Sequence, residues 1–188
     1  ELEGRPQAAE EGSREALRIA ICGVGVVGRA TGEGFARLGH EVWTYDIDPS
    51  RAQVSWATSL KRARSPLGCG IVFFCTPEEE VEAAVRGWVG PGLRVVRSST
   101  PPGTVNSLSS ALRYEVIHNP EFLREATALQ DFLNPAYILL GIPFWGAKAE
   151  IIKELYRPFG VPILMTDPTT SEMVKLATNG FLAAIIAY

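Results

Sequence analysis

Residues 18–28 read RIAICGVGVVG, and this stretch carries the clearest indication of the fold. It begins with an apolar, β-rich run and continues into a Gly-x-Gly-x-x-Gly loop that opens a segment of helical character. Asp46 ends the next β-rich run, EVWTYD. A glycine loop between a strand and a helix, followed by an acidic residue at the end of the second strand, is the pattern of a dinucleotide-binding βαβ unit.

Each part of this loop has a predicted role in holding a dinucleotide. Gly23 allows the tight turn, Gly25 lets the backbone approach a pyrophosphate at the helix N-terminus, and Gly28 lets the helix pack closely on the strand. An aspartate in this place accepts hydrogen bonds from ribose hydroxyls and repels a 2′-phosphate, so we expect NAD rather than NADP. The expected cofactor-binding residues of this region are Gly23, Gly25, Val26, Val27, Gly28 and Asp46.

Outside the glycine loop, short β-rich runs alternate with segments of helical length. This alternation predicts an α/β fold, namely a Rossmann-type doubly wound, mostly parallel sheet with helices on both faces. A further helix is expected at about 145–157, followed by a strand in VPILMT. Residues 1–16 form a charged tail, 17–169 the Rossmann domain, and 170–188 the start of a long C-terminal helix. The β-rich runs are RIAICG, EVWTYD, GIVFFCT, LRVVRSS, YEVIHN and AYILLG.

Composition excludes several classes of function. The net charge is −3, and the basic residues are scattered among acidic ones, so no nucleic-acid partner is expected. The three cysteines show no metal-ligand spacing, which favours a reduced, cytoplasmic chain without a metal. No apolar run is long enough to span a bilayer and no signal peptide is apparent, so we expect a soluble protein with no membrane partner.

Two more predicted strands end in polar residues that point to the same cofactor. The carboxyl ends of parallel strands meet at one edge of the sheet, where open α/β folds bind ligands. Cys75, Thr76 and Pro77 end one strand, and Ser98 and Ser99 end the next. Thr76 is expected either to cap the following helix or to contact the cofactor, and Cys75 is expected to be a small apolar strand residue rather than a nucleophile.

Taken in order, the motifs resemble one family. The glycine loop, Asp46, C-T-P, S-S-T-P-P-G-T, N-P-E-F-L-R-E with A-T-A-L-Q-D behind it, and S-E-M-V-K-L-A-T-N-G-F-L-A follow one another. This series is similar to the N-terminal NAD-binding domain of the UDP-glucose/GDP-mannose 6-dehydrogenase family over about residues 17–188. The N-P-E-F-L-R-E segment is its most specific part.

The resemblance implies an oxidoreductase of polysaccharide biosynthesis. Members oxidise the C6 alcohol of a UDP- or GDP-hexose to a uronic acid with two NAD, through a cysteine thioester. By motif, Glu121 would activate water, Lys175 and Asn179 would stabilise the oxyanion, and Ser99 would stand at the family's catalytic threonine. Substrate contacts would come from Glu121, Phe122, Leu123, Arg124, Lys175 and Asn179. The remaining cofactor contacts would come from Cys75, Thr76, Pro77, Ser98, Ser99 and Glu125.

This chain departs from the family pattern in three places. Thr100 stands where the family has valine, which leaves the placement of the Ser99 hydroxyl open. The segment between Asp46 and Cys75 is short, which predicts a trimmed strand or helix. None of the three cysteines matches the family's nucleophile, so we expect this chain alone to be inactive.

The sequence leaves two alternative functions open and predicts a homodimer. The chain could instead be a β-hydroxyacid or 6-phosphogluconate-type dehydrogenase domain that uses Lys175 as acid/base, or a non-catalytic NAD-binding or dimerisation module. The hexose and the nucleotide stay undetermined. Apolar residues are spread widely around the segment 173–188, and the corresponding helix of the family forms much of a dimer contact, so a homodimer through residues 173–188 is expected.

Overall fold

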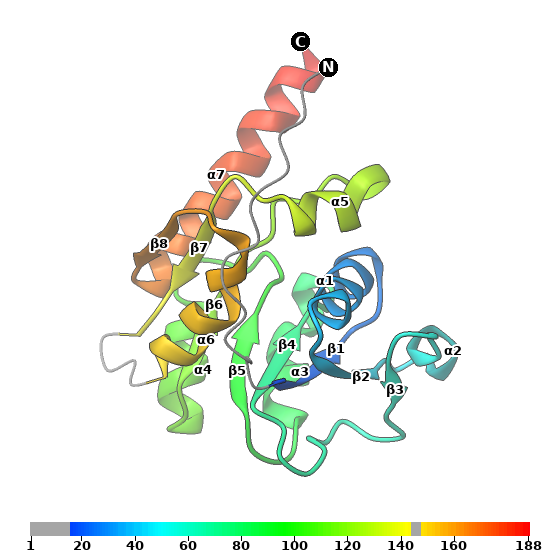
Figure 1. Ribbon diagram of the computed structural model, residues 1–188. Coiled ribbons are helices and arrows are strands. Elements are labelled where there is room, and N and C mark those ends of the chain that lie inside the picture. The colour runs from blue at the N-terminus through cyan, green and yellow to red at the C-terminus, as the bar shows by residue number, and fades with distance from the viewer. Residues whose placement is uncertain (1–15, 144–147) are drawn as a thin grey trace, which may run out of the picture.

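The computed structural model describes residues 16–143 and 148–188, and the fold is a single eight-stranded sheet with helices on both faces (Figure 1). The strand order is β3-β2-β1-β4-β5-β6-β7-β8. The strands are β1 (Arg18–Cys22), β2 (Glu41–Tyr45), β3 (Thr58–Ser59), β4 (Ile71–Phe74), β5 (Leu93–Val96), β6 (Val116–His118), β7 (Ile138–Gly141) and β8 (Ile163–Thr166). This arrangement confirms the predicted Rossmann-type fold.

All neighbouring strands are parallel except β6 and β7, which pair in antiparallel fashion at His118 and Gly141. The chain order reverses across β1, because β2 lies on one side of it and β4 on the other. In open α/β sheets such a reversal leaves a crevice at the carboxyl ends of the strands, and that crevice is the usual place for a ligand.

Helices cover the two faces of the sheet with separate apolar cores. One core joins Phe35, Phe73, Phe132 and Tyr156, and the other joins Phe74, Val85, Trp88 and Val105. Successive residues of β4 alternate between the two cores, as buried strands require. The helices are α1 (Val26–Arg37), α5 (Ala128–Leu133) and α6 (Ala149–Tyr156) on the first face, α3 (Val81–Gly87) and α4 (Thr104–Leu112) on the second, α2 (Pro49–Ala52) beside β2, and α7 (Pro168–Ala187).

Two local expectations need correction. Thr76 does not cap a helix, because a 3-10 turn at Glu78–Glu80 precedes α3 and its N-cap is Pro77, with no side-chain cap bond. The long C-terminal helix begins at Pro168 rather than at residue 170, since the carboxylate of Asp167 accepts the N–H of Thr170 at 3.0 Å. Such a cap fixes where a helix begins.

Other expectations fall partly outside the described residues. The predicted charged tail lies there except for Ala16, as does the part of the predicted helix at 145–157 that precedes Lys148. Between Asp46 and β4 the regular elements are the four residues of α2 and the two of β3, which matches a shortened segment. No helix of the described residues is long and apolar enough to cross a membrane.

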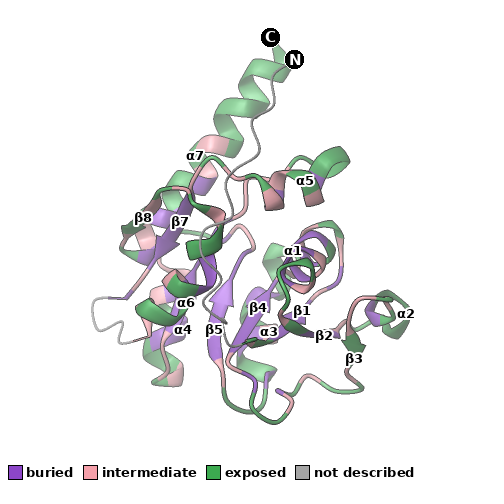
Figure 2. Cartoon of the chain, in the orientation of Figure 1, coloured by how far each residue is buried: buried purple, intermediate pink, exposed green. Residues whose placement is uncertain are grey.

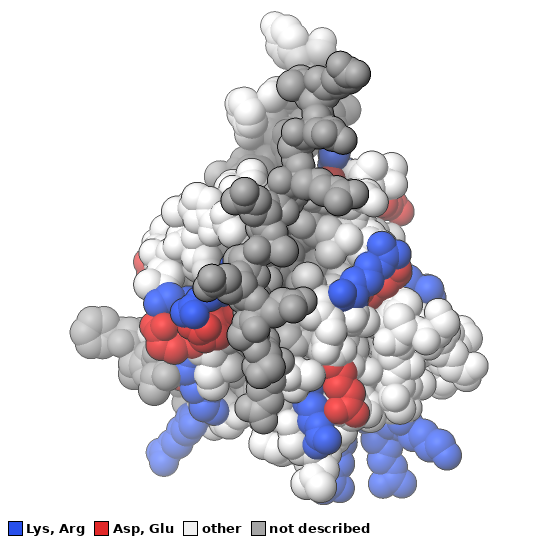
Figure 3. Space-filling view, in the orientation of Figure 1, with Lys and Arg blue, Asp and Glu red and all other residues white. Residues whose placement is uncertain are grey.

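Charged side chains of both signs share the face drawn in Figure 3. Basic and acidic groups lie next to one another in a few small clusters, and several Lys and Arg side chains project along the lower edge of this face. The C-terminal half of α7 extends away from the body of the domain and is exposed along its length (Figure 2). Its apolar side chains include Phe181, 67% exposed, and Ile186, 85% exposed.

Candidate functional site

The glycine loop follows β1 at the reversal point of the sheet. Gly23 has a φ of 90°, and a Cβ there would lie 2.7 Å from the carbonyl oxygen of Cys75. A Cβ on Gly28 would lie 1.8 Å from the carbonyl oxygen of Gly23. Both glycines are therefore required by the chain's own atoms, for the turn and for the packing of α1 on the loop.

Gly25 differs from both of its neighbours. It caps the N-terminus of α1 with a φ of −73°, and no atom lies within 4 Å of the place a Cβ would take. Neither backbone conformation nor packing within the chain explains a glycine here. Open space over a helix N-terminus is what the close approach of a pyrophosphate needs, so this residue fits NAD.

The carboxylate of Asp46 is held beside the glycine loop. Its Oδ2 accepts the N–H of Val24 at 2.7 Å, and its Oδ1 accepts the N–H of Asp48 at 2.9 Å. The N–H of Gly23 in turn donates to the carbonyl of Tyr45 at 2.9 Å. The glycine loop and the end of β2 thus form one hydrogen-bonded unit.

A cavity of about 630 Å³ lies over this unit. Of the predicted cofactor residues, Gly23, Gly25, Val26, Val27, Asp46, Cys75, Thr76 and Pro77 line it. Gly28 lies behind the loop, and Ser98, Ser99 and Glu125 do not line the cavity. The lining also includes residues that the sequence did not suggest, namely Cys22, Tyr45, Ile47, Arg51, Ala63, Glu80, Ala83, Ala84 and Gly87. Of these residues, only Ile47 could have been inferred from the sequence, because it directly follows Asp46 at the end of the second strand.

The side chains of Thr76, Cys22 and Cys75 in the cavity wall carry a hydroxyl or a thiol. The hydroxyl of Thr76 is buried and has no hydrogen-bond partner among the described residues. A buried polar group without a partner is costly, so this hydroxyl is suited to a polar group of a bound cofactor. Burial, the largest cause, raises the pKa of both Cys22 and Cys75 to about 12, so both thiols stay protonated at neutral pH.

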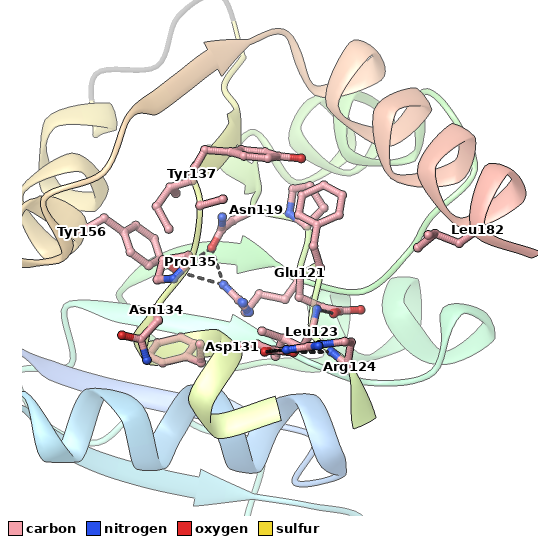
Figure 4. Close-up of a pocket in the computed structure, with 16 residues that line it drawn as sticks. Asn119, Glu121, Leu123, Arg124, Asp131, Asn134, Pro135, Tyr137, Tyr156 and Leu182 are labelled. Carbon is pink, nitrogen blue, oxygen red and sulfur yellow. Dashed lines mark hydrogen bonds and ion pairs between the residues drawn. The ribbon is translucent and has the colours of Figure 1, made fainter. Parts of the chain in front are cut away.

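A second centre lies where the loop after β6 meets α7. The Nζ of Lys175 lies 2.9 Å from Oε1 of Glu121 and 2.5 Å from its backbone carbonyl oxygen. The side chains are 5% and 15% exposed, respectively. The other carboxylate oxygen of Glu121 accepts the N–H of Leu123 at 2.7 Å, and the ring of Phe122 lies 5.3 Å from Nζ. Figure 4 shows Glu121 and Leu123 in the cavity beside this loop.

The other predicted catalytic residues lie less close to this pair. Asn179 is one helical turn beyond Lys175 on α7 and is exposed. Ser99 is half-buried in the turn after β5, and neither residue has a side-chain hydrogen bond within the described part of the chain. The structure thus brings Glu121 and Lys175 together and leaves the Asn179 amide and the Ser99 hydroxyl available.

Two buried polar side chains, those of Glu172 and Thr100, help to fix the position of α7. Glu172 is fully buried, and its carboxylate accepts the N–H groups of Gly103 and Val105 at 2.6 and 2.9 Å and the hydroxyl of Thr100 at 3.0 Å. These donors lie at the N-terminus of α4, where a carboxylate is favourable. Thr100, the family's valine position, therefore takes part in anchoring the helix that carries Lys175.

His118 links this helix to the cofactor cavity. Its Nε2 lies 3.2 Å from the carbonyl oxygen of Ser98, and its Nδ1 lies 2.8 Å from the hydroxyl of Ser171 on α7. A carbonyl only accepts, so Nε2 carries the proton and Nδ1 accepts from Ser171. Ser98 in turn donates to the carbonyl of Thr76 at 2.5 Å. A continuous chain of hydrogen bonds thus joins the cavity wall to α7.

Arg124 has a structural contact in addition to its predicted substrate role. Its Nη2 and Nε lie 2.7 and 3.1 Å from the two carboxylate oxygens of Asp131 on α5, and its own N–H donates to the same group. Figure 4 shows this bidentate pair. These hydrogen bonds hold the pKa of Asp131 well below its usual range. The aspartate of the A-T-A-L-Q-D motif therefore binds the arginine of N-P-E-F-L-R-E and holds the loop between the two motifs.

Part of the chain matches the model of a known family. Residues 79–160 match the model of the UDP-glucose/GDP-mannose dehydrogenase family, NAD binding domain. The UDP-glucose 6-dehydrogenase of Rickettsia conorii is 40% identical over 102 residues, which are 51% of this chain and 23% of that protein. UDP-glucose 6-dehydrogenase TuaD of Bacillus subtilis is 29% identical over 222 residues, covering 91% of this chain and 47% of that protein. The chain thus spans between about a quarter and a half of these curated relatives.

Solved structures give the same result for the fold. A UDP-glucose dehydrogenase from Pyrobaculum islandicum superimposes with a TM-score of 0.79 at 25% identity, over 94% of this chain and 52% of that one. A GDP-mannose dehydrogenase from Pseudomonas aeruginosa, solved as a ternary complex, gives a TM-score of 0.77 at 23% identity, over 90% and 51%. At 23% identity, the similarity to the GDP-mannose dehydrogenase supports a shared fold and nothing more. The matched family model supports NAD as the cofactor.

Proposed function

Because the chain belongs with the NAD-binding domains of the UDP-glucose/GDP-mannose dehydrogenase family, we propose that it serves the oxidation of a nucleotide sugar. The substrate is the C6 alcohol of a UDP- or GDP-hexose. The hydroxymethyl carbon gives up two hydrides to two NAD molecules, gains the oxygen of a water molecule, and ends as the carboxylate of a uronic acid.

The single observation that carries this proposal is the contact between Lys175 and Glu121. Glu121 comes from N-P-E-F-L-R-E, the motif most specific to the family, Lys175 comes from the C-terminal helix motif, and their side chains lie 2.9 Å apart. A helix charge with only a structural role would more often be solvated, whereas this ammonium is 5% exposed.

The chemistry needs a cation and an acceptor at this place. As the alcohol loses its hydride, negative charge develops on the sugar oxygen, and the ammonium of Lys175 with the amide of Asn179 would stabilise it. The carboxylate of Glu121 would orient the water that releases the acid. Bound NAD would supply the hydride acceptor, and Gly25, Asp46 and Thr76 would hold it.

The thioester step needs a nucleophile that the described thiols do not offer. Cys22 and Cys69 are buried, and Cys22 and Cys75 stay protonated at neutral pH because burial raises the pKa of each to about 12. A thiolate, not a thiol, is the attacking species. We therefore propose that these three cysteines take no part in the covalent step.

The test uses the natural protein that contains this domain. NADH formation is followed with UDP-glucose and with GDP-mannose for the wild type, Lys175→Ala and Glu121→Gln. Each variant should lose activity by roughly a hundredfold or more, the range for loss of a group that stabilises an oxyanion. Lys153→Ala, which removes a paired lysine from the surface of α6, is the matched control and should keep full activity. Full activity of Lys175→Ala, or none in the wild type with either sugar, would overturn the proposal.

We also propose a homodimer through residues 173–188. Support comes from the exposed apolar side chains on the projecting half of α7, which include Phe181, Leu182, Ile185 and Ile186. An apolar surface of this extent is uncommon on a soluble monomer, because covering it with another chain is favourable.

A further inference from the structure

The guanidinium of Arg97 has no counter-charge among residues 16–143 and 148–188, and the proposed function gives it no role. Arg97 directly follows β5 and lines a cavity of about 370 Å³, separate from the one over the glycine loop. It is only 5% exposed. The walls of this cavity are largely apolar, and Figure 4 shows Tyr137, Pro135 and Leu182 among them.

The hydrogen bonds of Arg97 go to neutral groups. Its Nη1 donates to Oδ1 of Asn119 at 2.6 Å and to the hydroxyl of Tyr156 at 2.8 Å. The Tyr156 hydroxyl then donates to the same Asn119 oxygen at 2.5 Å. Within the described part of the chain, Nε is buried without a partner and Nη2 donates no hydrogen bond.

The other charges around the cavity are already paired. Glu121 is paired with Lys175, and Asp131 with Arg124. Among the described residues no carboxylate oxygen lies within 4.0 Å of the Arg97 guanidinium. Burial raises the pKa of the neighbouring Tyr156 hydroxyl to about 12, so it carries no negative charge at neutral pH. One buried cation is left over, and an unpaired buried charge is costly.

We propose that Arg97 is the anchor of an oxyanion-binding subsite that takes a carboxylate or a phosphate group. The two free N–H donors, Nε and Nη2, lie on one edge of the planar guanidinium, and such an edge binds two oxygens of one anion side by side. Phe132 packs on the guanidinium, with its ring centre 5.6 Å from Cζ, and keeps this edge in place. Apolar walls exclude water, which strengthens the contact.

The subsite goes beyond the proposed function, because neither NAD nor the sugar was assigned a contact with Arg97. A phosphate could come from a nucleotide or be free, and a carboxylate could come from an acidic sugar or another small acid. Both share two oxygens with delocalised negative charge. Inorganic phosphate and acetate are therefore suitable separate probes.

The test is a titration of the wild-type protein followed by the backbone amide signals in NMR. Phosphate or acetate should shift the amides of Asn119 and of residues 121–124 in a saturable way, and sodium chloride at the same ionic strength should not. Saturation with only one of the two anions identifies which head group is preferred. Shifts that stay linear, or that occur only at the glycine loop 23–28, would overturn the proposal. Loop shifts alone would leave the NAD assignment intact, so the two proposals fail separately.

Two variants complete the test. Arg97→Met should weaken the binding of the effective anion by at least tenfold while the response of residues 23–28 to NAD stays unchanged. Arg86→Met is the matched control, since it removes an exposed cation that is paired with Glu82 on α3 and does not line this cavity. It should keep the subsite. If Arg97→Met does not fold, the wild-type titration still decides.

Discussion

Lys175 and Glu121 lie 54 residues apart in the chain, and their side chains meet at 2.9 Å. The pair joins the loop after β6 to α7, and both partners are largely removed from water. Because the pair is buried, loss of either partner leaves the other charge without compensation. Within the described part of the chain each of the two charges has the other as its only ion-pair partner, so the pair holds the helix as well as the candidate reaction site.

Removal of one partner should therefore cost more than removal of both. We expect Lys175→Met to lower the free energy of unfolding by about 3 kcal/mol, because Glu121 is left as a buried charge without a partner. The double variant Lys175→Met with Glu121→Gln should recover most of this loss. Urea unfolding of the four proteins measures the effect. Lys153→Met, from the exposed pair with Glu150, should change stability by about 0.5 kcal/mol or less. Equal costs for the single and double variants would mean that the pair is not coupled.

Substitutions of the loop glycines should have separate effects on NAD affinity and on stability. Gly25→Ala adds a Cβ where no atom of the chain lies within 4 Å, so stability should change by about 0.5 kcal/mol or less. The same Cβ occupies the space predicted for the pyrophosphate, so the affinity for NAD should fall by roughly tenfold or more, about 1.4 kcal/mol.

Gly28→Ala is the contrasting variant. Its Cβ would lie 1.8 Å from a backbone oxygen, so the protein should lose about 3 kcal/mol of stability or fail to fold. Thermal unfolding and NAD titration of both variants test the distinction. Unimpaired NAD binding by Gly25→Ala would show that the open space above residue 25 is not the pyrophosphate site.

Asp46 should set the preference for NAD over NADP. The wild type should bind NAD more tightly, because the carboxylate accepts the ribose hydroxyls and repels a 2′-phosphate. Asp46→Ala should narrow the difference between the two affinities, since it removes the carboxylate that repels a 2′-phosphate while Arg51 still lines the cavity. Asp46→Asn keeps the shape of the side chain and isolates the effect of charge. Calorimetric titration with both cofactors is the measurement, and equal affinities in the wild type would contradict the assignment.

Local patterns in the sequence predicted the fold well. The alternation of β-rich runs and helical segments gave the long strands, because burial on both faces leaves a continuous apolar run in each. It did not give the direction of β7, since strand direction depends on how the whole connection after β6 crosses the sheet. The two residues of β3 are exposed and carry no apolar signal, so that strand was not predicted either.

The candidate site was only partly predictable. The glycine loop and Asp46 are close in sequence and follow a known spacing, whereas Glu121 and Lys175 were identified only through the order of motifs. The hydrogen bonds of His118 and Arg97 connect residues far apart in the chain, and no local pattern reports such contacts. For Arg97, the sequence showed only that an arginine follows an apolar strand, which does not predict a cavity.

His118 should make stability depend on pH. Burial, the largest cause, lowers its pKa to about 4, and the nearby cations Lys175 and Arg97 add to this. The unfolded chain binds a proton near pH 6.5, so between pH 6.5 and 4 it holds more protons than the folded state. Stability should therefore be complete above pH 6.5 and fall by about 3 kcal/mol as the pH approaches 4.

The measurement is urea unfolding across this pH range. His118→Gln should flatten the slope. His40→Gln is the control at the second histidine, whose pKa burial also lowers but which lies half-buried at the far end of β1. An unchanged slope in His118→Gln would assign the acid sensitivity to other groups.

The exposed half of α7 should bring two chains together. Phe181 and Ile185 are 67% and 57% exposed on the projecting part of the helix (Figure 2). Burying such side chains against a second copy is favourable by about 25 cal/mol per Å² of apolar surface. Light scattering at about 100 micromolar, where a contact of roughly 6 kcal/mol is populated, should show a dimer or a larger species. Phe181→Glu with Ile185→Glu should give a monomer, because the charges would be buried in the contact. Leu67→Glu, at a side chain 93% exposed in a loop remote from α7, should leave the dimer intact. A monomeric wild type at this concentration would show that α7 alone does not drive association.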